Sequence, residues 1–210
     1  VALVLAGACA LGLPGARALL DDAMRWMLAC RRGSRSRFVF PSMELVDAES
    51  LPSRAAWCYG DPGVAVTLLA TARAAGSAEW EAAALAAAER AAARPAVDCG
   101  VTDAGVCHGA AGLALMFHRL WHATGDARFA AAARRWYEHT LDLHRPGCGV
   151  GGYQAWSPPR TPATHGAWEA DRSLLTGASG IGLVLLAGLG IEPRWDRMLA
   201  ASLPPWVWAS

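Results

Sequence analysis

Residues 57–70 read WCYGDPGVAVTLLA, in which the pair Gly60 and Gly63 precedes an uninterrupted apolar run. The same G-x-x-G pattern opens apolar runs at Gly109 and at Gly177, after gaps of about 50 and about 70 residues. Self-similarity at such long periods is typical of stacked supersecondary units. We therefore expect a chain built from repeated helical units, each of which begins at a pair of glycines.

An amphipathic run follows each of the first two apolar runs. Residues 78–94 are rich in alanine with scattered charges, and residues 126–144 alternate apolar with charged side chains. A helix that is apolar around its whole circumference is buried, whereas a helix with one polar face lies at the surface. The pattern predicts an all-α fold in which inner and outer helices form two layers, as in an α/α toroid. Only residues 38–40 (Phe-Val-Phe) have a strand-like composition, and this run is short.

The first residues of the chain resemble an inner apolar run that lacks its preceding glycines. We interpret residues 1–210 as a single domain truncated at its N-terminus and therefore as a fragment of a longer protein. The two long loops, residues 31–53 and 147–167, are rich in Ser, Pro, Gly and Arg. Long loops in compact domains are often functional, so we expect them to cover the rim of the barrel and meet a substrate.

Composition excludes several classes of protein. Hydrophobic residues make up 54% of the chain and charged residues 18%, which fits many buried helices and argues against disorder. The net charge of +1 gives no electrostatic case for binding nucleic acid. All basic residues are Arg, so neither a lysine Schiff base nor a P-loop lysine is possible. The richness in Ala and Arg suggests a bacterial source. No apolar stretch is long enough for a transmembrane segment and no signal peptide is evident, so we expect reduced cysteines and a cytoplasmic location.

Cysteine and histidine occupy equivalent places in the first two motifs. Cys58 lies two residues before Gly60, and Cys107 and His108 directly precede Gly109. Loops at equivalent positions of a helical barrel gather at one end, so these ligands can converge despite their separation in sequence. Two Cys and one His would leave a fourth zinc position open, as in catalytic sites, where a substrate thiol would lose its proton. The alternative is that the cysteines are small buried side chains and the histidine belongs to a loop.

Arg54, Tyr59 and Asp61 flank the first cysteine. One interpretation places a guanidinium and a phenol beside the metal, where they polarise a carbonyl or transfer a proton. The other interpretation is a surface Arg, a buried Tyr and a turn Asp.

The remaining histidines and cysteines are weaker candidates for ligands. His118 and His122 lack the Glu of an H-E-x-x-H site, so we interpret them as structural or surface residues. Cys99 and Cys148 lie in loops and are reserve ligand candidates.

Three segments resemble the lanthionine synthetase cyclase (LanC-like) family. They are RAAWCYGDPG at 54–63, CHGAAG at 107–112 and LLTGASGIG at 174–182. The resemblance implies an α/α toroid, of which this chain would be a partial barrel covering the C-terminal half. It also implies a Zn²⁺ ion held by Cys58, Cys107 and His108. It implies a cyclase that adds Cys thiols of a dehydrated precursor peptide to dehydroalanine or dehydrobutyrine, forming lanthionine or methyllanthionine thioethers.

Further expectations come from the same resemblance. The positions of Arg54 and Tyr59 belong to the active-site surroundings of the family, so both are candidate catalytic residues. The family's proton donor, a His in an A-H-G motif, is expected upstream of Val1, so this fragment alone is not expected to close a toroid or to be fully active. Partners would be the precursor peptide and a dehydratase or a kinase/lyase, either separate or fused.

Two other functions stay open at this point. LanC-like proteins can keep the zinc site yet serve as glutathione-binding or scaffold proteins without cyclase activity. An α/α-barrel carbohydrate enzyme would need paired carboxylates across a cleft, whereas the acidic residues here fall mostly on the expected outer helices.

Overall fold

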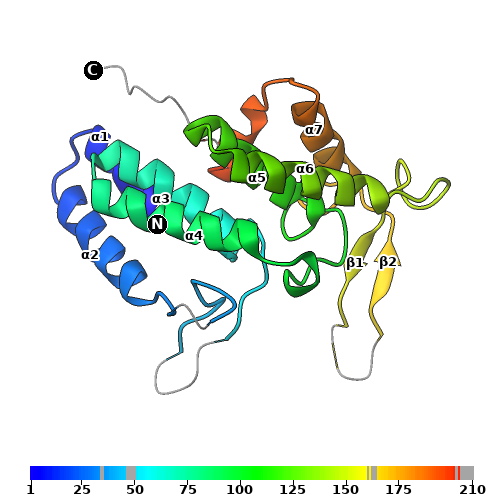
Figure 1. Ribbon diagram of the computed structural model, residues 1–210, viewed down its shortest axis with the longest axis horizontal. Coiled ribbons are helices and arrows are strands. Elements are labelled where there is room, and N and C mark those ends of the chain that lie inside the picture. Colours follow the sequence, from blue (N-terminus) through cyan, green and yellow to red (C-terminus); the bar gives the residue numbers. More distant parts are fainter. Residues whose placement is uncertain (34–35, 46–50, 160, 162–164, 202, 204–210) are drawn as a thin grey trace.

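The computed structural model (Figure 1) describes residues 1–33, 36–45, 51–159, 161, 165–201 and 203. Most of these residues are helical, which confirms the expected fold class. The α-helices are α1 (Ala2–Ala10), α2 (Ala16–Ala29), α3 (Asp61–Ala75), α4 (Ala78–Ala93), α5 (Ala110–Thr124), α6 (Ala127–Asp142) and α7 (Ala178–Gly188). Two short 3₁₀ helices, η1 (Ala96–Asp98) and η2 (Arg194–Leu199), complete the helical part.

The helices form two layers of hairpins. α1, α3, α5 and α7 pack side by side in that order as the inner layer, and α2, α4 and α6 pair with the first three of them. Figure 1 shows the α3–α4 and α5–α6 hairpins next to one another, and α4 also contacts α6 in the outer layer. The predicted alternation of inner and outer helices is therefore confirmed.

Burial follows the apolar pattern of the sequence. The side chains of α3 and α5 are buried on most sides, whereas α4 and α6 bury only one face. α1 and α7 lie at the two ends of the inner layer and expose apolar side chains, including Val4 and Leu186. The inner layer of the described residues is thus an open arc.

Local signals explain where the hairpins turn. Gly76 and Gly125 adopt left-handed conformations (φ 66° and 71°) at the ends of α3 and α5, as helix C-caps commonly do. The side chains of Ser77 and Asp126 then accept the backbone N–H groups of Trp80 and Arg128, which begins the outer helices. Each hairpin therefore needs only a short connection.

The second glycine of each G-x-x-G pair is required by close packing. A Cβ atom at Gly63 would overlap the carbonyl oxygen of Trp57, and one at Gly112 would overlap that of Val106. Gly180 makes the same close approach to Leu174. The loop before each inner helix can lie against the first turn only because this side chain is missing.

Residues 38–40, which have a strand-like composition, do not form a strand. In residues 38–40, the N–H groups of Val39 and Phe40 donate to the buried carboxylate of Asp61 rather than to a neighbouring strand. The sheet of the described residues consists of β1 (Ala155–Ser157), in the second long loop, and β2 (Ala167–Glu169), at the end of that loop, paired antiparallel. Figure 1 shows this β hairpin extending away from the helical layers.

Parts of both long loops, including residues 46–50 and 162–164, lie outside the described residues. None of the described helices combines the length and apolar character that a crossing of the bilayer would demand.

Candidate metal centre

The three G-x-x-G loops are joined in series by backbone hydrogen bonds. The N–H groups of Trp57 and Cys58 donate to the carbonyl of Cys107 at 3.1 and 3.4 Å. The N–H of Cys107 donates in turn to the carbonyl of Leu175 at 2.8 Å. Cys58, Cys107 and Leu175 each lie two residues before the first glycine of their motif. Equivalent positions of successive repeats therefore meet at one end of the inner layer.

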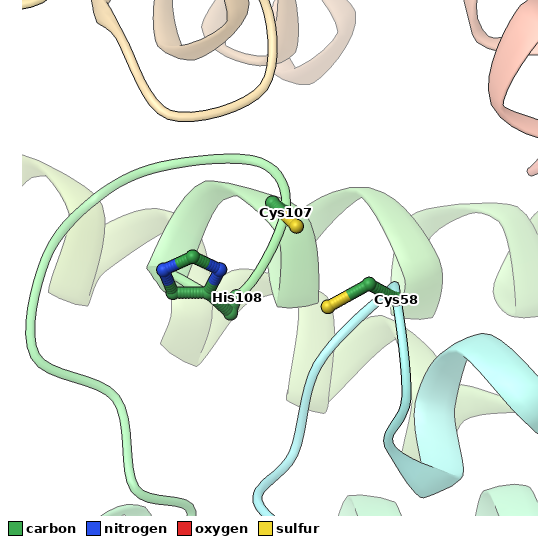
Figure 2. A group of neighbouring side chains, drawn as sticks. All are labelled: Cys58, Cys107 and His108. Atoms are coloured by element: carbon green, nitrogen blue, oxygen red, sulfur yellow. The ribbon is translucent and has the colours of Figure 1, made fainter. Parts of the chain in front are cut away.

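This arrangement brings together Cys58, Cys107 and His108. Their potential ligand atoms all lie within 4.8 Å of one another, and no other trio of such side chains gathers anywhere in the described ranges. Figure 2 shows that Cys58 comes from the loop before α3 and that the other two come from the loop before α5. Cys58 is exposed and the other two are half-buried, so the cluster is accessible from solvent.

The donor set fits a divalent metal such as Zn²⁺. Burial lowers the pKa of His108, which keeps the imidazole neutral and able to donate a lone pair. Burial, followed by a hydrogen bond and a charge interaction with Cys58, raises the pKa of the Cys107 thiol to about 12. A bound cation offsets such a rise, because coordination deprotonates a thiol outright. Two sulfurs and one imidazole fill three of the four positions that zinc prefers.

Asp103 fixes the loop that carries Cys107 and His108. This buried carboxylate accepts the N–H of Gly105 at 3.0 Å, and its other oxygen accepts the N–H of Trp156 at 2.9 Å. Asp103 thereby ties strand β1 to the candidate metal loop. Asp103 was not among the residues predicted from the sequence, although Asp103 and Asp171 each precede the first glycine of their motif by six residues. That repeated spacing was the available signal.

Residues 2–200 match the family described as Lanthionine synthetase C-like protein. This chain belongs to that family. Among solved structures, nisin cyclase matches with a TM-score of 0.66 at 20% sequence identity. The match covers 95% of this chain and 47% of nisin cyclase, so the chain spans about half the length of that protein. No sequence among the curated proteins matches.

The structural match supports the α/α toroid fold that the LanC-like resemblance implied. The two layers of helices in this LanC-like chain are then one arc of such a toroid. Sequence identity at this level shows the fold alone.

Arg54 and Tyr59 lie beside one another in this LanC-like site. The guanidinium carbon of Arg54 is 5.7 Å from the centre of the Tyr59 ring, a cation–π distance. The pKa of His108 is lowered mainly by burial, and the charge of Arg54 lowers it further. Tyr59 is 39% exposed, so the predicted buried Tyr of the alternative interpretation is wrong. A cation and an exposed phenol therefore border the ligand cluster.

Asp61 has a structural role. Its buried carboxylate accepts the N–H groups of Val39 and Phe40 and forms an ion pair with Arg94. These contacts fasten the loop after α2 and the end of α4 to the start of α3. A turn position was one of the two interpretations of Asp61 from the sequence, and its buried partners were not predicted.

The weaker candidates lie elsewhere. His118 is buried on α5, with its Nδ1 3.4 Å from the Tyr137 hydroxyl, while His122 is exposed. Cys99 is buried and donates to the carbonyl of Pro95, and Cys148 is exposed. None of these joins the Cys-Cys-His cluster.

A pocket of about 330 Å³ borders the ligand-bearing loop. Its walls include Asp103, Arg145, Gln154 and Trp168. The second long loop, through the β hairpin, therefore reaches the rim near the cluster.

Proposed function

We propose that the full-length protein is a zinc-dependent lanthipeptide cyclase. It adds Cys thiols of a dehydrated precursor peptide to dehydroalanine or dehydrobutyrine, forming lanthionine or methyllanthionine. The convergence of Cys58, Cys107 and His108 at an accessible end of a LanC-like fold carries this proposal. Three protein ligands leave one position for the substrate sulfur. We also propose a cytoplasmic location, where these cysteines stay reduced.

Each residue of the site has its own role in the proposed addition reaction. Cys58, Cys107 and His108 would hold Zn²⁺, which when bound would lower the pKa of the substrate thiol and keep its sulfur nucleophilic. The sulfur forms a bond to the β-carbon of the dehydro residue, and the α-carbon then takes up a proton. Negative charge grows on the substrate carbonyl oxygen during this addition. Arg54 stabilises that charge and Tyr59 donates a hydrogen bond to it.

The surrounding loops position the peptide. The pocket beside Asp103, with Arg145, Gln154 and Trp168, accepts a side chain of the precursor next to the reacting cysteine.

The test is the reaction itself. The purified full-length protein, loaded with zinc, is incubated with a dehydrated precursor peptide, and free thiols are counted by alkylation and mass spectrometry. Because addition is an isomerisation, we expect alkylatable thiols to disappear while the peptide mass stays constant. The Arg54→Gln variant should be slower by roughly 100-fold, because charge stabilisation by one group is worth about this much. An unchanged thiol count with zinc bound would contradict the cyclase and favour the glutathione-binding or scaffold alternative.

A further inference from the structure

The segment after α7 returns across the inner helices. We call residues 191–201 and 203 the return segment. Leu199, Ala201 and Leu203 are buried and belong to the same hydrophobic core as the inner helices. In Figure 1 this orange-to-red part of the chain turns back from α7 toward α5. It therefore packs as part of the arc.

One anchor of the return segment is Arg119 on α5. Its guanidinium forms a paired contact with the carboxylate of Asp196, at 2.5 Å from Nε and 3.0 Å from Nη2. It also donates to Glu192 and to the carbonyl of Pro193. Arg119 and Asp196 are both buried, and a paired guanidinium–carboxylate contact fixes orientation as well as distance. The return segment is thus held in one register on α5.

The other anchor lies at the candidate metal centre. The indole Nε1–H of Trp57 donates to the carbonyl of Leu199 at 2.8 Å, across 142 positions of the sequence. The backbone N–H of the same residue donates to the carbonyl of Cys107 at 3.1 Å. Trp57 is therefore held by its backbone to one ligand loop and by its side chain to the return segment. The next residue is Cys58, the most exposed member of the cluster.

We propose that Trp57 is a positioning residue for the metal centre, and that the return segment, locked by Arg119 and Asp196, holds Cys58 in place through it. The inference rests on the proposed function only in taking Cys58 as a metal ligand. Outer contacts of this kind tune metal affinity by orienting the ligands. The competing explanation is that the return segment only adds to the stability of the core.

The deciding variant is Trp57→Phe, which keeps an aromatic ring and removes the indole N–H. Trp136→Phe is the matched control, because Trp136 is buried on the outer helix α6. Zinc release to a chromophoric chelator, the visible spectrum of the cobalt-substituted protein and thermal unfolding are measured for the full-length protein. We expect Trp57→Phe to release zinc about tenfold faster and to change the thiolate-to-cobalt absorption, while Trp136→Phe does neither.

A second variant tests the route through the return segment. Asp196→Asn keeps the shape of the side chain and weakens its pairing with Arg119, and it should change zinc release in the same direction. If Asp196→Asn does not fold, Trp57→Phe decides alone. Zinc release and cobalt spectra equal to those of the parent, with only a lower unfolding temperature, would overturn the proposal.

The outcomes separate this inference from the proposed function. Cys58→Ala must lose zinc; if it keeps stoichiometric zinc, the inference fails whatever the activity. A protein that binds zinc and responds to Trp57→Phe as expected, yet closes no rings, supports the inference and defeats the cyclase proposal.

Discussion

The loop before α5 and the loop before α7 share a backbone plan and differ in chemistry. In both, a second glycine lies against a preceding carbonyl, and an Asp six residues before the first glycine accepts backbone N–H groups. Yet Cys107 and His108 of the first loop correspond to Leu175 and Thr176 of the second. The comparison shows that the glycines and the Asp build the loop, while the two residues before the first glycine decide what the loop can bind.

The largest expected effect is on metal content. Cys107→Ala removes a proposed ligand and should leave the purified protein with almost no zinc, because two protein ligands hold the ion poorly. Leu175→Ala is the matched control at the equivalent position and should keep stoichiometric zinc. Elemental analysis measures zinc, and circular dichroism checks that both variants are helical. Equal zinc in the two variants would remove the chemical difference between the loops.

The next largest effect concerns the second glycine of the motif, which both loops share. Gly112→Ala places a Cβ against the carbonyl of Val106 and should lower the free energy of unfolding by about 3 kcal/mol. Gly182→Ala on α7 is the control, since a Cβ there meets nothing within 4 Å, and it should raise stability by about 0.5–1 kcal/mol. Denaturant unfolding measures both. If Gly112→Ala is tolerated as well as Gly182→Ala, close packing does not explain the glycine pair.

The third prediction compares the N-terminal end of α5, near which Cys107 and His108 lie, with the middle of the helix, where His118 lies. Burial, followed by the charges of His122 and Arg119, lowers the pKa of His118 from 6.5 to about 4. Between these values the unfolded chain binds a proton that the folded chain does not, so stability falls as the pH drops from about 6.5 to about 4. This group should remove about 2–3 kcal/mol over that window.

His118→Phe tests this assignment, because it should flatten that part of the pH profile in urea unfolding at pH values from about 7 to about 4. Parallel profiles for the variant and the parent would show that another group causes the acid sensitivity.

The smallest expected effect separates the two Asp residues. Asp103→Asn should loosen the candidate metal loop and weaken zinc binding about tenfold, as loss of a supporting contact does. Asp171→Asn alters the corresponding contacts of the loop before α7, with Ser173 and Thr176, so zinc affinity should stay unchanged and stability should fall by about 1 kcal/mol at most. Competition with a zinc indicator measures the affinities. Equal losses would mean that both loops support the metal.

Repetition made much of this molecule predictable from sequence. Gly60, Gly109 and Gly177 mark equivalent helix starts, and that equivalence indicates that Cys58 can meet Cys107 and His108. A repeat indicates which positions lie together in the fold even when the contacts between them are unknown, so the clustering of these three candidate ligands was predictable.

Features outside the repeat were not predictable. The pair Arg119 and Asp196 joins distant parts of the chain, and no local periodicity encodes such a contact. The strands β1 and β2 are only three residues long, so their pattern is too short to recognise. Phe38-Val39-Phe40 has strand composition, but its backbone partners are the side-chain oxygens of Asp61, which propensity does not anticipate.

The close approach at Gly112 has a consequence for how such a centre can arise. Its contact joins a Cβ position to a backbone carbonyl, so it makes no demand on the two side chains that project from the same loop. Duplication of one hairpin therefore copies the loop backbone together with the two side-chain positions that precede its first glycine. A metal-binding site can then be gained or lost by a few point mutations at these positions, while the fold stays the same.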